Sequence, residues 1–190
     1  MEMSAPTLNV KAHILNVDGN WGTSGFRASA LTDVVQKVHF CAHTNADNSG
    51  ADGQPATNHW SLFMEISPAR SVRIDISPGE PHKPGMIIID IKTYSVTQKN
   101  VYDGYYVVPQ GTTVGTILEL IIRKGRDRYI FSAVGEGCRY WLKTLAWDMA
   151  EAHLLSSEAA QEISNALAYY WKYPKNSGYE PRAMATGTFF

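Results

Sequence analysis

The sequence predicts an α+β protein in which strands of the N-terminal half form an antiparallel sheet that packs against helices of the C-terminal half. Between residues 37 and 108, apolar and polar residues alternate, which is the period of a half-buried strand. From residue 113 the period lengthens to that of an amphipathic helix. The chain of 190 residues is 44% hydrophobic. We therefore expect a single domain over 1–190, with tails at 1–6 and 181–190.

Turn-forming residues separate the expected strands. The first strand is predicted at 7–17, where Asp18-Gly19-Asn20 ends it, and later strands are predicted at 37–44, 58–66, 71–76, 86–96 and 105–108. The turn at Ser67-Pro68-Ala69-Arg70 predicts a hairpin between the third and fourth of these. Residues 45–55 are small and polar, which predicts a mobile loop.

Three helices follow the strands. The spacing of Val114, Ile117, Leu118 and Ile121 predicts the first helix, and Gly125 ends it. A second helix is expected to start at or near Cys138, with Trp141, Leu142, Leu145 and Met149 on its apolar face. Ser157 is the expected N-cap of a third helix, over 158–170.

Charge, the length of the apolar stretches and the N-terminal residues argue against nucleic acid, a membrane span and secretion. There are 17 Lys and Arg against 18 Asp and Glu, and this balance gives no global field that would attract nucleic acid. The apolar stretches are far shorter than the roughly 20 residues of a membrane span. Residues 1–6 carry no secretory signal, so a cytoplasmic protein is expected. No feature indicates a bound cofactor.

Cys138 is the most informative residue for chemistry. Two cysteines occur, Cys41 and Cys138, without a Cys-x-x-Cys pair, so both are expected to be free thiols and a cysteine-built zinc site is not expected. Cys138 follows Gly135-Glu136-Gly137 at an expected helix start, where free N–H groups favour the thiolate. The alternative reading is a small apolar core residue.

A thiolate nucleophile needs a partner that transfers protons, and His59 is the best placed histidine because it begins a strong strand. Asp75 lies on the next strand. An odd-length loop centred on Pro68 would place Asp75 opposite Ser61, on the face of His59, whereas a two-residue turn would turn it to the other face. Each residue taken alone also fits an ordinary structural role.

Other groups of residues are weaker candidates. His39, Cys41 and His43 alternate on one strand face and offer metal ligands at i, i+2 and i+4, although no metal site is predicted. The basic segment 123–128 offers contacts to an anionic group, and its alternative is a solvated helix end. The aromatic segment 169–173 either lines a pocket or packs the last helix.

The order of a strand histidine, a polar residue on the next strand and a cysteine at a helix start resembles the circularly permuted branch of the papain-like cysteine superfamily. This branch includes relatives of lecithin retinol acyltransferase and permuted cell-wall peptidases. The resemblance rests on Asn58-His59-Trp60-Ser61-Leu62-Phe63 and Gly137-Cys138-Arg139-Tyr140-Trp141-Leu142 and spans about residues 37–150. The whole chain is also similar to a group of uncharacterised fungal proteins.

The resemblance implies a permuted papain-like fold and a thiol-dependent hydrolase or acyltransferase that acts on an acyl, amide or thioester carbonyl. Its substrate would be a small molecule or a peptide, with small-molecule biosynthesis as one setting. Cys138 would be the nucleophile, His59 the base and Asp75 the residue that orients it. The neighbouring residues expected to contact substrate are Trp60, Ser61, Glu136, Arg139 and Trp141.

Two other functions stay open at this point. His59 and acidic groups could transfer protons in a non-covalent isomerase or cyclase. The fold could also serve as a non-catalytic binding module. The distance between Cys138 and His59, and the presence of a cleft beside them, distinguishes these functions from thiol chemistry.

Overall fold

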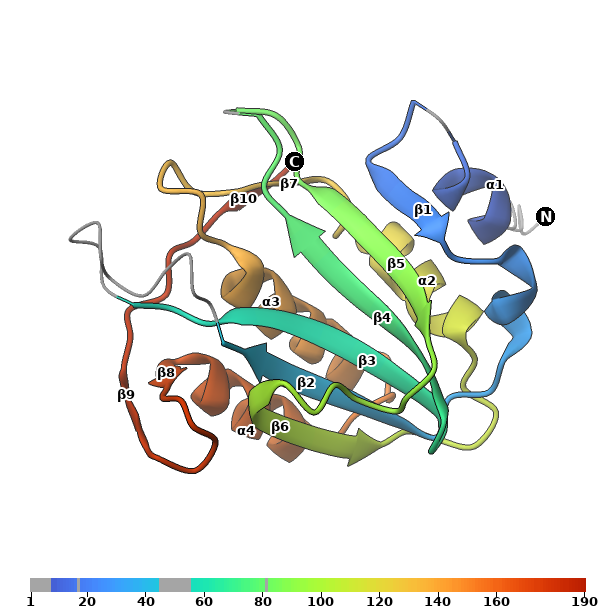
Figure 1. The fold of residues 1–190 in the computed structure, drawn as a ribbon. Coiled ribbons are helices and arrows are strands. Elements are labelled where there is room, and N and C mark those ends of the chain that lie inside the picture. Colours follow the sequence, from blue (N-terminus) through green and yellow to red (C-terminus); the bar gives the residue numbers. More distant parts are fainter. Residues whose placement is uncertain (1–7, 17, 45–55, 81) are drawn as a thin grey trace.

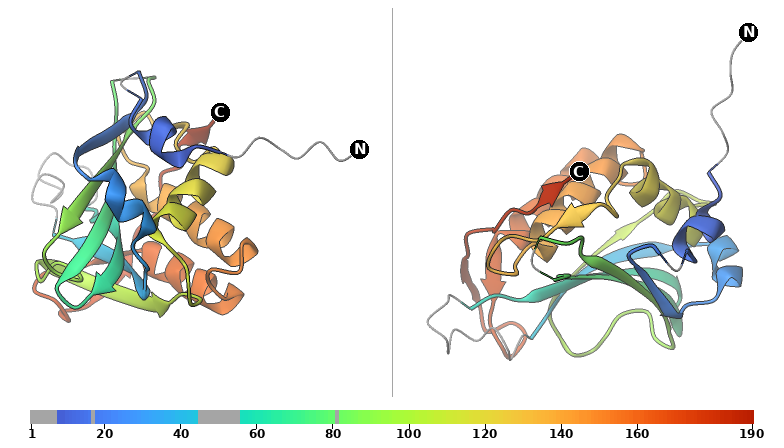
Figure 2. Two further views of the ribbon diagram at one scale, coloured as in Figure 1. Left: turned by 90° about the vertical axis from the view of Figure 1, so that its right-hand side faces the viewer. Right: turned by 90° about the horizontal axis from the view of Figure 1, so that it is seen from above.

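The computed structural model describes residues 8–16, 18–44, 56–80 and 82–190. They form a mixed α+β structure of two layers, a twisted sheet and a layer of helices that covers one of its faces (Figures 1 and 2). The predicted mobile loop at 45–55 and the predicted tail at 1–6 lie outside the described residues. Among the described residues, no helix is long and apolar enough to cross a membrane.

The main sheet has six strands in the order β1-β5-β4-β3-β2-β6. Their bounds are β1 Trp21–Gly25, β2 Lys37–His43, β3 His59–Ser67, β4 Arg70–Ser77, β5 Met86–Lys92 and β6 Asn100–Val107. Neighbouring strands are antiparallel except for β1, which runs parallel to β5 at the edge. The sheet is therefore mixed, and the prediction of a purely antiparallel sheet was wrong on this point.

The helices are α1 Val10–Ile14, the 3-10 turn Ala28–Thr32, α2 Val114–Arg123, α3 Cys138–Glu151 and α4 Ser157–Leu167. The first strand was predicted where α1 lies. Asn9 begins this short helix because its side chain accepts a hydrogen bond from the backbone N–H of Ala12 (3.0 Å). The cap of α4 is Ser156 rather than Ser157, and the helix ends three residues before Tyr170.

The core lies between the sheet and the helices. Along β3, Trp60, Leu62 and Met64 are fully buried on the face toward the helices. Ile117 and Leu118 of α2 and Leu145 of α3 meet this layer from the other side. Because side chains alternate along a strand, the opposite face of β3 carries His59, Ser61, Phe63 and Glu65. His59 and Glu65 therefore lie on the face of the sheet that the helices do not cover.

Four short strands complete the structure: β7 Tyr129–Ile130, β8 Tyr169–Trp171, β9 Tyr179–Pro181 and β10 Thr188–Phe189. β8 pairs with β9, and β10 pairs with β7. The prediction that 181–190 is a tail was wrong, because this segment crosses the molecule from β9 to β10 (Figure 1). Phe189 of β10 packs against Tyr129, with ring centroids 4.7 Å apart.

Candidate functional site

Cys138 is the first residue of α3, and its sulfur lies at the positive end of the helix dipole. The N-cap is Gly137, and no side chain caps this end of the helix. The N–H groups of the first three helical residues therefore have neither an intrahelical partner nor a side-chain cap. The carbonyl of Gly137 accepts a hydrogen bond from the Tyr129 hydroxyl (3.0 Å), which fixes the chain just before the cysteine.

His59 opens β3 and is bound through one ring nitrogen to a carboxylate. Its Nε2–H donates to Oδ1 of Asp75 at 2.5 Å. The Asp75 side chain is only 10% exposed, whereas that of His59 is 35% exposed. A buried carboxylate thus holds the imidazole in one orientation while the rest of the ring remains accessible from the site.

A β-bulge brings Asp75 to the face of His59. The hairpin has a two-residue turn, with Ser67 paired to Arg70, and this register alone would turn Asp75 toward the core. The register shifts by one residue between Glu65 and Ser67, so that Leu62 pairs with Ile74 and Asp75 falls opposite Ser61. The extra residue, Ile66, therefore produces the arrangement that an odd-length loop would have given.

The charges at the site favour the imidazolium form of His59. Burial lowers the pKa of His59, but hydrogen bonds to Asp75 and Cys138, together with the charges of both groups, outweigh it and raise this pKa to about 10. His59 thus contacts the carboxylate and the cysteine together. At neutral pH the ring of His59 therefore carries a proton.

His43 on β2 stacks on His59 with ring centroids 5.8 Å apart. Burial and the charge of His59 lower the pKa of His43 to about 4, so His43 is neutral at pH 7. Ser61 Oγ lies 2.9 Å from Nε2 of His43 and fixes its ring. The sequence interpretation considered His43 only as a metal ligand. Its place opposite His59 in the pairing of the two strands is the signal that would have linked them.

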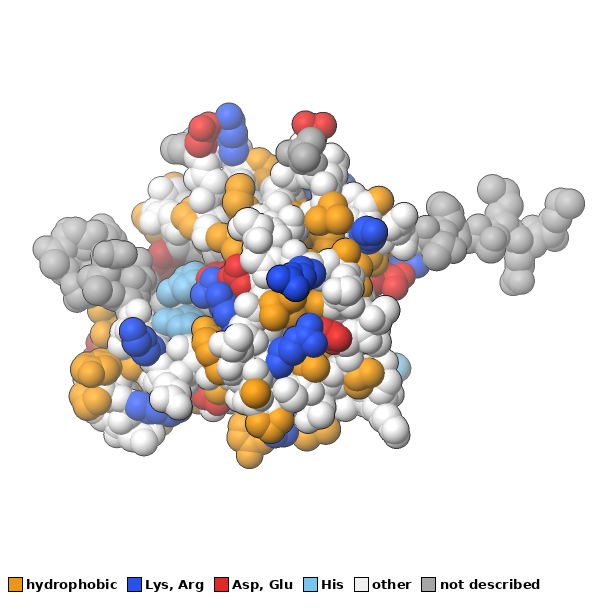
Figure 3. Space-filling view, turned by 45° about the vertical axis from the view of Figure 1, so that its right-hand side comes forward, with side chains coloured by type: hydrophobic (Ala, Val, Ile, Leu, Met, Phe, Trp, Pro, Cys, Tyr) orange, Lys and Arg blue, Asp and Glu red, His pale blue; other side chains and the backbone are white. Residues whose placement is uncertain are grey.

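A cavity of about 160 Å³ opens at the cysteine. Cys138 and His59 line it with Asn58, Phe131 and Gly137. The histidine side chains reach the surface beside both acidic and basic groups (Figure 3). The pair thus lies at an opening rather than in a closed core.

Only two of the five residues expected to contact substrate line this cavity: Glu136 and Arg139. Trp60 and Trp141 are completely buried in the core, and the indole N–H of Trp141 donates to the carbonyl of Arg126 (2.6 Å). Ser61 is also buried and supports His43.

Arg139 holds the end of the chain against α3. Its guanidinium donates to the carbonyls of Leu167 (3.1 Å), Arg182 (3.0 Å) and Ala183 (2.7 Å). Glu136 binds Arg182 at 2.6 Å and lies 3.5 Å from Arg139. These contacts show how Glu136 and Arg139 shape the wall of the cavity, with most of the Arg139 donors already used by backbone carbonyls.

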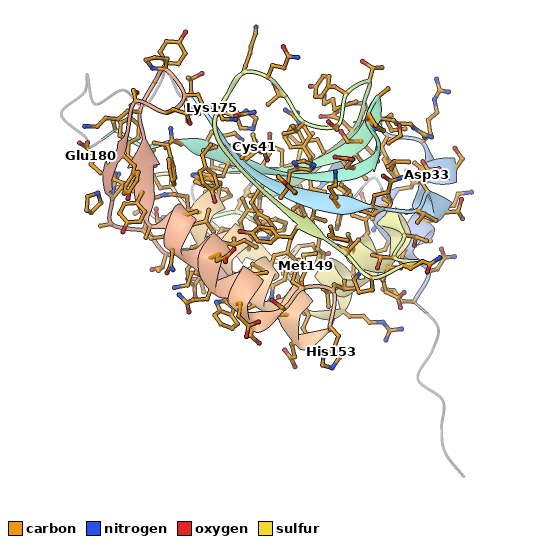
Figure 4. The ribbon with its side chains drawn as sticks, turned by 90° about the horizontal axis from the view of Figure 1, so that it is seen from below. Asp33, Cys41, Met149, His153, Lys175 and Glu180 are labelled. Carbon is orange, nitrogen blue, oxygen red and sulfur yellow. The ribbon has the colours of Figure 1, made fainter. Side chains whose placement is uncertain are left out.

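Cys41 differs from Cys138 in every respect that matters for reactivity. It is completely buried in the middle of β2, within the sheet (Figure 4). Burial, followed by the charge of Asp103, raises the pKa of its thiol to about 12. Cys41 is therefore a neutral thiol at physiological pH.

The remaining candidates have structural partners. His39 lies between Asp103 (3.0 Å) and Glu65 (2.8 Å), and the described residues include no group of three or more His, Cys, Asp or Glu arranged to hold a metal ion. In the basic segment, Arg123 pairs with Glu119, Lys124 with Glu151 and Arg126 with Asp148. The aromatic segment forms β8 rather than the end of α4.

The fold and this geometry define an α+β protein in which a cysteine and a histidine line one cavity and a buried aspartate binds the histidine. The chain belongs to the family described as a domain of unknown function, DUF7770, whose profile matches residues 38–190. All three residues lie within the matched region. Comparison with curated proteins and with solved structures gave no match.

Proposed function

We propose that this protein is a thiol-dependent hydrolase or acyltransferase, with Cys138 as nucleophile, His59 as the group that transfers protons and Asp75 as the residue that orients His59. One observation carries the proposal: the imidazole of His59 contacts both a buried carboxylate and a cysteine at an uncapped helix start. Such an arrangement activates a nucleophile in place, without a metal or an organic cofactor.

Acylation would begin from the ion pair. The Cys138 thiolate attacks the carbonyl carbon of an ester, thioester or amide, and the C=O electron pair moves to oxygen. When the tetrahedral intermediate collapses, the bond to the leaving group breaks and the imidazolium of His59 gives its proton to that group. The products are an acyl-enzyme and a neutral His59.

In deacylation, His59 first accepts a proton and the thiolate of Cys138 becomes the leaving group. Neutral His59 takes a proton from water, or from an acceptor alcohol or amine, as its oxygen or nitrogen attacks the acyl carbon. The thiolate then leaves, which restores the ion pair and releases an acid or a transferred acyl product. Because Asp75 accepts the Nε2–H of His59, it stabilises the imidazolium at the start and end of the cycle.

The end of α3 supplies a place for the oxyanion. The N–H groups of Cys138, Arg139 and Tyr140 precede the first intrahelical bond, which runs from the N–H of Trp141 to the carbonyl of Gly137 (2.9 Å), and these three residues begin the helix next to the cavity. Donors at fixed positions stabilise the charge that develops on the carbonyl oxygen, and removing one such donor typically costs about 100- to 1,000-fold in rate.

The order of the elements supports a permuted papain-like arrangement. His59 lies on β3, Asp75 on the adjacent β4, and Cys138 follows them on a helix packed against β3. The proton-transfer alternative, an isomerase or cyclase, needs a neutral base near working pH. The raised pKa of His59 favours the thiolate chemistry over that alternative.

The test is to trap the acyl-enzyme by incubating the protein with an activated ester or thioester and measuring its intact mass. The proposal predicts one added acyl group on wild type and on Cys41→Ala, and none on Cys138→Ala. Turnover that survives in Cys138→Ser but is abolished in His59→Ala would instead favour proton transfer. Acylation that is unchanged in Cys138→Ala would contradict the assignment of the nucleophile.

A further inference from the structure

A second and larger cavity lies beside the catalytic one. Its volume is about 680 Å³, and it is lined by residues from the end of β2, the start of β6 and the segment of β8 and its turn. Asn58, the residue before His59, lines both cavities. The two cavities therefore adjoin at Asn58, next to the proposed catalytic histidine in the sequence.

Asn58 makes the wall between the cavities rigid. Its side-chain amide donates to the carbonyls of His43 (3.1 Å) and Trp171 (3.0 Å), and its oxygen accepts from the N–H of Trp171 (2.7 Å). It is only 2% exposed. These bonds fix β8 against the ends of β2 and β3, so the position of the larger cavity relative to His59 is set by the fold.

Aromatic side chains form one side of this cavity: Tyr170, Trp171 and Tyr173. The Trp171 ring is held by a bond from its N–H to the carbonyl of Ala166 (3.0 Å) and by contact with Tyr102, at a centroid distance of 4.2 Å. Tyr173 is 76% exposed. A fixed aromatic surface of this kind favours a flat ligand group that can stack on it.

Two lysines, Lys99 and Lys175, contribute positive charge to the same cavity. The ammonium of Lys175 donates to the side-chain oxygen of Asn100 at 2.5 Å, which directs it along the wall. Within the part of the chain that the structure describes, neither lysine pairs with a carboxylate. Five other lysines do have such a partner: Lys37, Lys83, Lys92, Lys124 and Lys172.

The position of Lys175 is visible in Figure 4, near the end of the sheet and on the side of the molecule that carries β8 and β9. Basic and hydrophobic side chains also gather below the histidines in Figure 3. A cavity with an aromatic surface and two lysines, neither of them paired with a carboxylate of the described residues, complements a flat group that carries negative charge.

We propose that this second cavity binds the anionic end of the substrate, an aromatic ring that bears a carboxylate or a phosphate, while the carbonyl of the same molecule meets Cys138. The inference rests on the proposed function for its link to catalysis, but the anion site itself does not. Lys99 and Lys175 would contact the anion, and the aromatic side of the cavity would contact the ring.

The binding test uses Cys138→Ala protein, so that no chemistry intervenes, and isothermal titration calorimetry. The probes are 2-naphthoate, 2-naphthyl phosphate and the uncharged 2-naphthamide. At least one anion is expected to bind about tenfold or more tightly than the amide, because a hydrogen bond to a charged group is worth about that factor. Whichever anion binds more tightly identifies the charged group. Equal affinity for the amide and both anions would overturn the proposal.

Three lysine variants locate the site. Lys99→Met and Lys175→Met should each weaken anion binding about tenfold. Lys11→Met is the matched control, since Lys11 lies on α1 at the other end of the sheet and should leave the affinity unchanged (Figure 1). Unchanged affinity in both cavity variants would overturn the proposal. Lys175→Met also removes the hydrogen bond to Asn100, which could disturb the local fold, so Lys99→Met provides a second test without that loss.

The two proposals can fail separately. Anion binding that depends on these lysines, in a protein that forms no acyl-enzyme at Cys138, would support the site and contradict the thiol chemistry. An acyl-enzyme that forms with the same KM from charged and uncharged aromatic thioesters would support the thiol chemistry and contradict the anion site.

Discussion

His59 joins the two halves of the candidate site, because it contacts a carboxylate from β4 and a cysteine from α3. Its raised pKa, to about 10, has a clear consequence for pH dependence. The protonated ring stabilises the folded site fully below its unfolded value of about 6.5, and this contribution is lost as pH rises through about 10. We expect kcat/KM to fall over the same upper range, as the proton donor is lost. A profile still rising above pH 10 would contradict this role.

Asp75→Asn tests the orienting carboxylate. The change keeps the size of the side chain but removes the charge that favours imidazolium, so turnover should fall by about 100-fold or more. The His59 pKa, followed by NMR, should move down from about 10. Asp103→Asn is the control, because Asp103 lies on β6 at the same sheet face but pairs with His39 (3.0 Å) rather than with His59. If both variants reduce turnover equally, the loss of negative charge on this sheet face explains the effect better than the loss of the carboxylate that orients His59.

The sequence predicts which residues form the site better than it predicts the face of the sheet on which they lie. A cysteine after Gly135-Glu136-Gly137 and a histidine at a strand start are visible as patterns. The side of the sheet on which Asp75 lies could not be decided, since it depends on the bulge at Ile66 and Ile66 fits a regular strand equally well. Trp60 and Trp141 were expected to contact substrate, but their burial depends on how the layers pack.

The start of α3 is the element that positions the sulfur. A Cβ added to Gly137 would lie 2.6 Å from the hydroxyl oxygen of Tyr129 and 3.0 Å from a ring carbon of Phe131. Since both rings are packed, Gly137→Ala should move the helix start and slow alkylation of Cys138 about 10- to 100-fold. The control is Gly22→Ala on β1, where a Cβ meets atoms no nearer than 3.4 Å. Equal alkylation rates in the two variants would show that Gly137 does not position Cys138.

Element types and bounds were predictable where one face is strongly apolar. α2 and β2 to β4 follow such patterns closely. α1 and β1 do not, because a five-residue helix gives too little periodicity and β1 has few apolar residues of its own. The parallel pairing of β1 is likewise a tertiary feature, since β1 lies beside β5, more than 60 residues away in sequence.

The C-terminal segment 181–190 holds α3, the helix that begins with Cys138, in place. The N–H of Gly187 donates to the hydroxyl of Tyr129, which in turn donates to the carbonyl of Gly137. The segment carries charged and small residues without a clear period, so the sequence reads as a tail. Its role depends on long-range contacts with Arg139 and Tyr129.

Phe189→Ala should therefore lower the free energy of unfolding by about 2–3 kcal/mol, since Phe189 packs on Tyr129 and beneath the guanidinium of Arg126. Phe190→Ala is a matched neighbour, 57% exposed, and should change it by less than about 0.5 kcal/mol. Urea unfolding measures both values. Similar values for the two variants would mean that the C-terminal segment is not part of the core.

If His59 activates Cys138 as a thiolate while Cys41 stays inert, the two cysteines should differ in how fast iodoacetamide labels them at each pH. Mass spectrometry of peptides reads both cysteines in one sample. Cys138 should label readily at pH 6, where an ordinary thiol of pKa about 8.5 is almost wholly protonated, and Cys41 only after unfolding. His59→Ala should slow Cys138 labelling at pH 6 and leave the fold intact. If Cys138 labels no faster than an ordinary thiol, or at the same rate in His59→Ala, activation of Cys138 by His59 is contradicted.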